Sequence, residues 1–194
     1  ALMRVKQAIR EGRLWEYLEE ISRKHPRAME AFKVLRRFYK YLELRTPLSK
    51  GRVYGVKLYG FESIWNPKVL RFRLRSWRVI ETLLGEVEEV LLKPLLGGGG
   101  CLEGGVGLNV IYYTPYIGLI PSVICSVYPS TQHVRVGSVD PEALEDLTYS
   151  LRSIVAKARG RGVKLRVGYC SSYSWTLIVA REAEALGLDV VELC

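Results

Sequence analysis

The sequence of 194 residues has little of several residue types that catalysis and metal binding commonly use. It contains two histidines, and its four cysteines show no Cys-x-x-Cys spacing, so no zinc site is expected. No apolar run approaches the ~20 residues of a membrane helix, and the first residues lack the pattern of a signal peptide. These absences predict a cytoplasmic protein with no membrane segment, metal or cofactor.

Amide side chains are also scarce, with two asparagines and two glutamines in the whole chain. This scarcity, combined with abundant Arg, Glu and Leu, is typical of thermophilic proteins. Cys125 and Cys170 lie in apolar or small-residue runs and are expected to be core thiols. A thermophilic source leaves an intracellular disulfide open as well.

The formal net charge of +9 is unevenly distributed. Residues 1–80 contain 20 Lys and Arg against 7 Asp and Glu, whereas residues 81–194 contain 9 against 13. A basic first part suggests a polyanionic partner, because phosphate backbones release condensed counterions when they bind cationic surfaces. The alternative is a basic, solvated surface without a specific partner.

The first part of the chain has the apolar periodicity of helices. One helix is expected over residues 13–25, where the dipeptide His25-Pro26 should end it. A second apolar stripe follows Pro26, and residues 45–60 are predicted to form a loop with a short strand at 53–58. The two stripes comprise Leu14, Leu18, Ile21, Met29, Phe32, Leu35, Tyr39 and Leu42.

Residues 66–85 allow two interpretations. Arginines that alternate with apolar residues resemble a strand, but Asn66 can cap a helix, Pro67 suits its first position and Gly85 its end. We therefore predict a helix. Its apolar face would comprise Leu70, Leu74, Trp77 and Leu84. Beside this face, arginines at i, i+4 and i+7 form either a phosphate-binding stripe or a solvated surface: Arg71, Arg75 and Arg78.

After Gly85, short apolar runs alternate with helical patterns. The predicted strands are 87–92, 108–113, 163–167 and 190–193, and the predicted helices are 140–160 and 174–187. Such alternation predicts a mainly parallel sheet covered by helices. The fold class is therefore α/β, with a basic helical N-terminal region (1–85) followed by a three-layer α/β/α sheet domain (86–194). Ligands of such sheets bind beyond the carboxyl ends of the strands.

Seven glycines surround Cys101 within residues 97–107. A phosphate-binding loop would need a following Lys-Ser or Lys-Thr and a helix, but a strand pattern follows here. Cys101 has no histidine or aspartate nearby in the sequence that could activate it as a nucleophile. We therefore predict a connecting loop in which Cys101 is the remaining reactive group, and we assign no catalytic residue.

Four segments, in consistent order, resemble the archaeal tRNA-guanine transglycosylases and the related archaeosine synthases. Segment 8–38 contains Glu-Gly-Arg-Leu-Trp-Glu and a later His-Pro, and segment 46–52 contains a Pro-x-Ser-Lys turn. In segment 59–75, Glu-Ser precedes a proline and basic residues, and segment 112–136 contains Tyr-Pro. The resemblance covers most of the chain. It implies a glycosylase-type three-layer fold for the second part.

The departures from this family are informative. The transglycosylase barrel with its catalytic aspartates precedes this region in the family, and an RNA-binding domain follows it. Archaeosine synthases carry Pro-Cys, Lys-Pro-Tyr, Ser and His after the strand equivalent to 87–92, whereas this sequence has Lys93-Pro94 and then glycines. The resemblance therefore implies a separate, shortened relative from the 7-deazaguanine tRNA-modification system that lacks the catalytic centre.

Three functions remain open. The first is a noncatalytic tRNA-binding or scaffold component, whose predicted phosphate contacts are Lys33, Arg36, Arg37, Lys40, Arg71, Arg75 and Arg78. Its aromatic faces for base stacking would be Tyr112, Tyr113, Tyr116 and Tyr128, although such tyrosines are more often half-buried.

The second is a nucleobase-handling enzyme of the glycosylase or transferase type. Its candidate pocket lies near a strand end and comprises Thr114, Tyr116, Tyr128, Ser130, Gln132 and His133. Gln132 could read a base edge through paired hydrogen bonds. The third is a structural domain that completes a split transglycosylase, with a separately encoded barrel protein as its partner.

Overall fold

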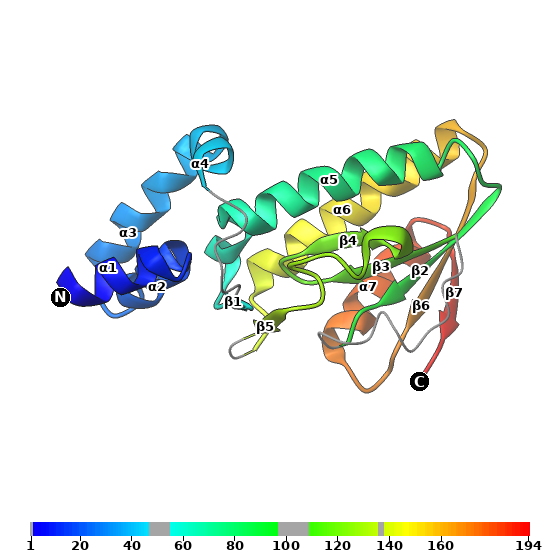
Figure 1. The fold of residues 1–194 in the computed structure, drawn as a ribbon. Coiled ribbons are helices and arrows are strands. Elements are labelled where there is room, and N and C mark those ends of the chain that lie inside the picture. The colour runs from blue at the N-terminus through cyan, green and yellow to red at the C-terminus, as the bar shows by residue number, and fades with distance from the viewer. Residues whose placement is uncertain (1, 47–54, 97–108, 136–137) are drawn as a thin grey trace.

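The first part of the chain folds into short helices (Figure 1). The computed structural model describes residues 2–46, 55–96, 109–135 and 138–194. The His25 ring caps α3 by accepting a hydrogen bond of 3.2 Å from the Arg27 N–H, which confirms the predicted break at His25-Pro26. The elements are α1 (Leu2–Arg10), α2 (Leu14–Ser22), α3 (Pro26–Val34), the 3-10 helix η1 (Leu35–Phe38) and α4 (Tyr39–Arg45).

Helix α5 (Pro67–Leu83) begins as predicted, because the Asn66 side chain accepts a hydrogen bond of 3.0 Å from the Lys68 N–H. Its buried face is rotated from the predicted one. Of the predicted apolar face, Leu84 is buried and Trp77 packs against the core, but Leu74 is 44% exposed. The face that packs inward comprises Val69, Phe72, Ser76 and Ile80. This choice lets Arg73 bind Asp146 on a neighbouring helix at 2.7 Å.

The central sheet has the strand order β4-β3-β2-β6-β7. All neighbouring pairs are parallel except β3 and β4. The predicted mainly parallel α/β sheet is therefore confirmed. The antiparallel edge strand was not predicted, because it follows β3 through a tight turn in which Gly118 has a φ of +84°. The strands are β2 (Glu89–Pro94), β3 (Val110–Thr114), β4 (Gly118–Pro121), β6 (Lys164–Tyr169) and β7 (Asp189–Glu192).

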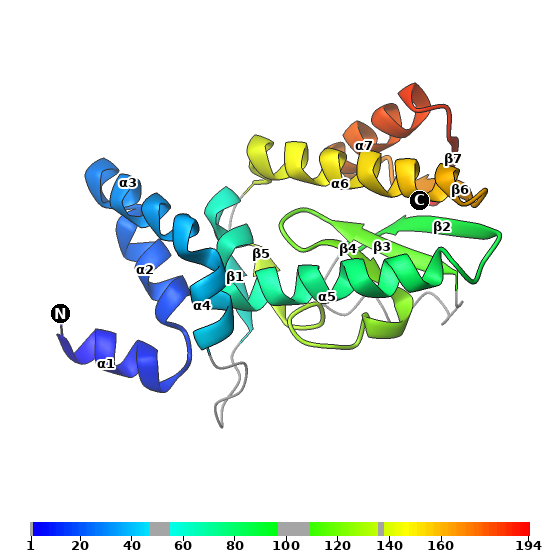
Figure 2. The same ribbon diagram turned by 90° about the horizontal axis from the view of Figure 1, so that it is seen from above.

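Helices α6 (Pro141–Gly160) and α7 (Ser174–Ala185) pack with the second half of α5 on the same face of the sheet. Figures 1 and 2 show α5 and α6 side by side above the strands, and two ion pairs, Arg73–Asp146 and Lys157–Glu81, join them. Asp140 caps α6 as expected from its position before Pro141. The main apolar cluster forms where the strands meet α5, α6 and α7. Its residues include Val90, Leu92, Ile111, Leu147, Leu151, Ile154 and Val167.

A second, two-stranded parallel sheet joins distant parts of the chain. β1 (Val56–Leu58) pairs with β5 (His133–Arg135), with Val56 opposite His133. The 3-10 helices η2 (Phe61–Trp65) and η3 (Ser122–Ile124) lie beside this sheet in the same apolar cluster. Residues from both sides of position 85 share that cluster, among them Val56, Leu58, Val69, Phe72, Tyr112 and Ile120.

Buried polar side chains connect α2 to the rest of the molecule. The Glu19 carboxylate is fully buried and accepts hydrogen bonds from Ser63 Oγ at 2.8 Å and from Arg23 at 3.1 Å. Burial raises the pKa of Glu19 to about 7, against the opposing effect of these hydrogen bonds. Glu16 is also buried, and its Oε1 lies 3.4 Å from Lys68 Nζ.

Cys170 and Cys194 form a disulfide, with their Cα atoms 4.7 Å apart. The bond ties the segment after β6 to the segment after β7. The expectation of core thiols is therefore wrong, and no cysteine in the described ranges is free. The predicted glycine loop with Cys101 lies outside the described residues.

Candidate functional site

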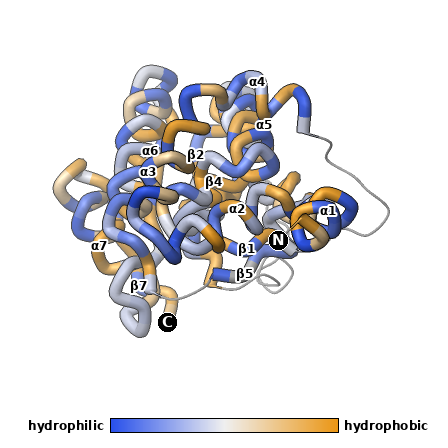
Figure 3. The backbone as a smooth tube through the Cα atoms, turned by 90° about the vertical axis from the view of Figure 1, so that its left-hand side faces the viewer, coloured by the Kyte–Doolittle hydropathy of each residue, from blue (hydrophilic) through white to orange (hydrophobic). Residues whose placement is uncertain are grey.

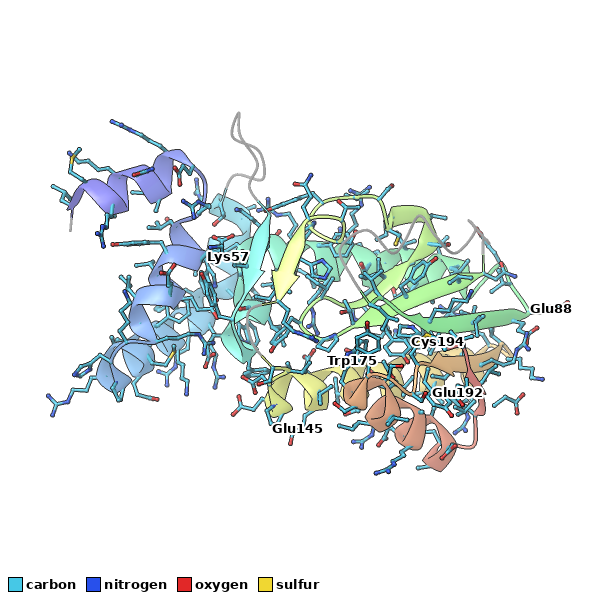
Figure 4. The ribbon with its side chains drawn as sticks, turned by 90° about the horizontal axis from the view of Figure 1, so that it is seen from below. Lys57, Glu88, Glu145, Trp175, Glu192 and Cys194 are labelled. Atoms are coloured by element: carbon cyan, nitrogen blue, oxygen red, sulfur yellow. A yellow bond between two sulfur atoms is a disulfide. The ribbon has the colours of Figure 1, made fainter. Side chains whose placement is uncertain are left out.

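A cleft of about 190 Å³ lies between the central sheet and the small sheet. One wall is formed by the segments that follow β2 and β3, and another by the start of α7, where Trp175 is labelled in Figure 4. The lining residues are Leu58, Leu95, Leu96, Thr114, Pro115, Tyr116, His133, Arg135, Tyr173 and Trp175.

The topology explains the position of this cleft. After β2 the chain forms β3 on one side of β2, and it later forms β6 on the other side of β2. Such a reversal of strand order leaves a crevice at the carboxyl ends of the strands, which is where open α/β sheets bind ligands. The cleft is thus at the position that the fold favours for a binding site.

Three of the six predicted pocket residues line the cleft, namely Thr114, Tyr116 and His133. The Ser130 hydroxyl is buried and donates to the Val127 carbonyl at 2.7 Å, so its role is structural. Tyr128 and Gln132 also lie outside the lining. Sequence patterns missed Arg135, Tyr173 and Trp175, because these residues reach the cleft only through the β1–β5 pairing and the start of α7.

Tyr116 has an unusual backbone conformation for a side chain of its size, with a φ of +70°. Its hydroxyl accepts a hydrogen bond of 3.0 Å from the Asp140 N–H, and its carbonyl accepts one of 2.9 Å from Arg73. Burial raises the pKa of Tyr116, so its hydroxyl is neutral at physiological pH. A strained residue that its surroundings hold in place is a frequent feature of functional sites.

His133 is held by its backbone neighbours. Its Nδ1 lies 2.8 Å from the Ser130 carbonyl oxygen. Burial lowers the pKa of His133, which favours the neutral imidazole. A carbonyl can only accept, so we infer that Nδ1 carries the proton and that Nε2 is the acceptor. A neutral imidazole near the Arg135 guanidinium could bind, and exchange a proton with, a polar or anionic group.

The predicted phosphate contacts differ in availability. Arg71 donates to Glu43 at 2.7 Å and to the Thr46 carbonyl at 3.2 Å, and Lys33 lies 3.4 Å from Glu30. Arg75 and Arg78 are exposed and make no ion pair within the described ranges. The same holds for the remaining three predicted contacts, Arg36, Arg37 and Lys40.

The predicted stacking tyrosines are mostly core residues. Tyr112, Tyr113 and Tyr116 are 4%, 1% and 1% exposed. Tyr113 also donates to the Gly168 carbonyl at 2.7 Å and packs edge-on against Trp175. Their rings are therefore not available for stacking on a base.

The described ranges contain no helix that could span a bilayer and no cluster of three or more potential metal ligands. Exposed apolar side chains occur in the helical region as well as elsewhere, and Figure 3 shows hydrophobic positions interspersed with hydrophilic ones along α1 and α4. They include Leu2, Met3, Phe38, Tyr41 and Leu44.

The structure is that of an α/β protein with a cleft at the topological switch point of its sheet. Comparison with curated proteins identifies its relatives. A tRNA-guanine(15) transglycosylase from Aeropyrum pernix is 39% identical over 100% of this chain, which spans 40% of that protein. The enzyme of the same name from Methanocaldococcus jannaschii is 36% identical over 67% of the chain, and the one from Sulfolobus acidocaldarius is 28% identical over 79%.

The family resemblance is therefore confirmed: this chain is related over its whole length to a part of the archaeal tRNA-guanine(15) transglycosylases. It spans well under half of the length of the relatives that it matches, with 40%, 20% and 30% for the three named above. No protein-family model matches the chain, and no solved structure does.

Proposed function

We propose that this chain is a noncatalytic tRNA-binding or scaffold component of an archaeosine-type tRNA-modification system and that it acts in the cytoplasm. The observation that carries the proposal is its full-length relationship to enzymes named tRNA-guanine(15) transglycosylase. The exposed cations of η1, α4 and α5 support it, because unpaired guanidinium and ammonium groups bind phosphates without first breaking an internal ion pair.

The tRNA contact is tested by replacing Arg75 and Arg78 with alanine and measuring tRNA affinity at several salt concentrations. Each lost phosphate contact should reduce the slope of log K against log salt by about 0.7 to 0.9. We expect the affinities for different tRNAs to fall by similar factors. The matched control replaces the exposed Arg161 and Arg181, which removes the same charge from the other part of the molecule. Equal losses of tRNA affinity in both variants would show that net charge alone, and not these two positions, determines binding.

A scaffold role requires a protein partner, and we propose a separately encoded protein that carries the transglycosylase barrel. The exposed apolar side chains of the helical region support this choice, since a partner could cover them. Co-purification from the native cell tests it. Recovery of a barrel protein without tRNA would favour the purely structural alternative, in which the chain completes a split transglycosylase.

The cleft supports a second candidate, a nucleobase-handling enzyme of the glycosylase or transferase type. The specific observation is a neutral His133 beside the strained Tyr116 at the switch point. Base exchange, amino-acid transfer or glycosylase turnover by the chain would favour it. His133→Asn should abolish such turnover while keeping the fold, because the asparagine amide can replace Nδ1–H as donor to Ser130 but not Nε2 as acceptor.

A further inference from the structure

The turn between β6 and α7, residues 170–173, adjoins the cleft. It ends in Tyr173 and leads to Trp175, and both of these residues line the cleft. Tyr173 is 39% exposed, whereas Trp175 is 4% exposed. The fold therefore holds these two neighbouring side chains of one wall to different degrees.

Trp175 is attached to the centre of the sheet. Its ring packs edge-on against Tyr113 of β3, with the ring centroids 5.7 Å apart. The Tyr113 hydroxyl in turn donates to the Gly168 carbonyl of β6 at 2.7 Å. These contacts fix Trp175 independently of the turn that precedes it.

Tyr173 has only local hydrogen bonds among the described residues. Its N–H donates to the Cys170 carbonyl at 3.1 Å, and its carbonyl accepts from the Thr176 N–H at 2.9 Å. The turn is joined to the neighbouring strand segment at one residue, Cys194. The Ser171 N–H donates to the Cys194 carbonyl at 2.9 Å, and the disulfide joins Cys194 to Cys170. Cys194 is therefore the anchor of the turn that carries Tyr173.

The disulfide is open to a reductant on one side. Cys170 is 1% exposed, whereas Cys194 is exposed. A thiolate of a dithiol reductant attacks the Cys194 sulfur, forms a mixed disulfide and releases Cys170 as a thiolate. The second thiol of the reductant then displaces Cys194, so the reductant becomes the disulfide and the chain gains two thiols. Only the hydrogen bonds from Ser171 still join the turn to Cys194.

We propose that the Cys170–Cys194 disulfide is a redox-sensitive switch that controls access to the cleft. The oxidised bond holds Tyr173 at the cleft wall, and reduction frees the turn while Trp175 stays packed against Tyr113. The physical reason is that a cross-link restricts the conformations of the segment that it ties, and weakly attached segments open first. Tyr173 controls access in this way whether or not the chain binds tRNA.

The two histidines of the chain allow a direct test. His133 lines the cleft, whereas His25 caps α3 in the helical region and serves as an internal reference. Diethyl pyrocarbonate acylates unprotonated imidazole nitrogens, so at fixed pH its rate at His133 measures access to the cleft. We expect reduction of the full chain by dithiothreitol to raise the His133 rate about tenfold and to leave the His25 rate unchanged. Equal His133 rates in the oxidised and reduced chains overturn the proposal.

A variant without the two thiols confines the change to this bond. Cys170→Ala with Cys194→Ala, measured without reductant, should match the reduced parent chain at His133. The matched control is Leu92→Ala, which destabilises the same sheet without touching the turn and should leave the His133 rate unchanged. An equal rise in Leu92→Ala would show that general loss of stability exposes His133, and the proposal would be wrong. If the double variant does not fold, reduction of the parent chain decides.

Tyr173→Ala tests whether this side chain is the element that moves. In the oxidised chain the variant should already react at His133 as fast as the reduced parent chain, because the side chain that restricts the cleft is absent. Reduction should then produce no further rise. A His133 rate that still increases on reduction of Tyr173→Ala contradicts the role assigned to Tyr173.

Discussion

The helical region and the central sheet of this molecule are stabilised by different means. The sheet and its helices enclose an apolar core, whereas residues 2–46 contribute only Ala8 and Phe32 as buried apolar side chains. The same helices bury Glu16, Glu19 and Ser22. Buried ionic contacts add little net stability because desolvation offsets their attraction, but they cost much when one partner is lost. The helical region should therefore open more easily than the sheet, and its stability should depend on pH.

The largest effect is expected for Lys68→Met. This change leaves the Glu16 carboxylate buried without its cation, which costs about 3–5 kcal/mol. We expect the amides of α1 and α2 to lose hydrogen-exchange protection while those of β2 and β6 keep theirs. Loss of protection throughout the molecule would show that the two regions unfold together.

The matched change in the sheet is Leu92→Ala. Leu92 is fully buried at the centre of the apolar core, so the cavity should cost about 2–5 kcal/mol. Here the cooperative melting temperature of the whole molecule should fall. A loss confined to α1–α4 would contradict the division between the regions.

Removal of the disulfide by Cys170→Ser with Cys194→Ser should destabilise the sheet by about 2–4 kcal/mol, because the bond closes a loop with a sequence separation of 24. Denaturant unfolding with and without reductant measures this. The helical region should be unaffected, and Cys170→Ala with Cys194→Ala serves as the control that lacks the added hydroxyl groups.

The pH dependence of the helical region should come largely from Glu19. Its pKa is about 7 in the folded protein and about 4.5 when unfolded, so the unfolded chain loses its proton first. The stability contributed by the neutral carboxyl is complete below pH ~4.5 and is lost as the pH rises through 7. The difference is on the order of 3 kcal/mol. Glu19→Gln should flatten the dependence of α2 exchange protection on pH over this window. If exchange protection in Glu19→Gln changes with pH as steeply as in the parent chain, another group causes the pH dependence.

Local signals predicted much of the fold. Asn66-Pro67 and Asp140-Pro141 mark the starts of α5 and α6, because capping and the fixed φ of proline act within a few residues. The strand and helix alternation after Gly85 predicted the mainly parallel sheet. The error at Leu74 arose because the apolar pattern did not reveal that Arg73 turns inward to Asp146, a partner 73 residues away.

The candidate site was predicted only in part, because its residues meet through contacts that no local pattern encodes. Thr114 ends β3 and Tyr116 follows it, and ligands of parallel sheets bind beyond the carboxyl ends of the strands. Arg135 and Trp175 join them only because β5 pairs with β1 and because α7 begins beside the sheet. The buried ion pair of Glu16 and Lys68 likewise joins residues that lie 52 positions apart.

The sequence by itself determined the class of this protein, its charge asymmetry, most of its helices and strands, and its relationship to the transglycosylases. These properties follow from composition, from periodicity and from short ordered motifs. The tertiary structure decided which arginines are exposed, that Cys170 bonds to Cys194, and where the cleft forms. Burial and pairing depend on residues brought together from distant positions, and so does the chemistry of the groups that they surround.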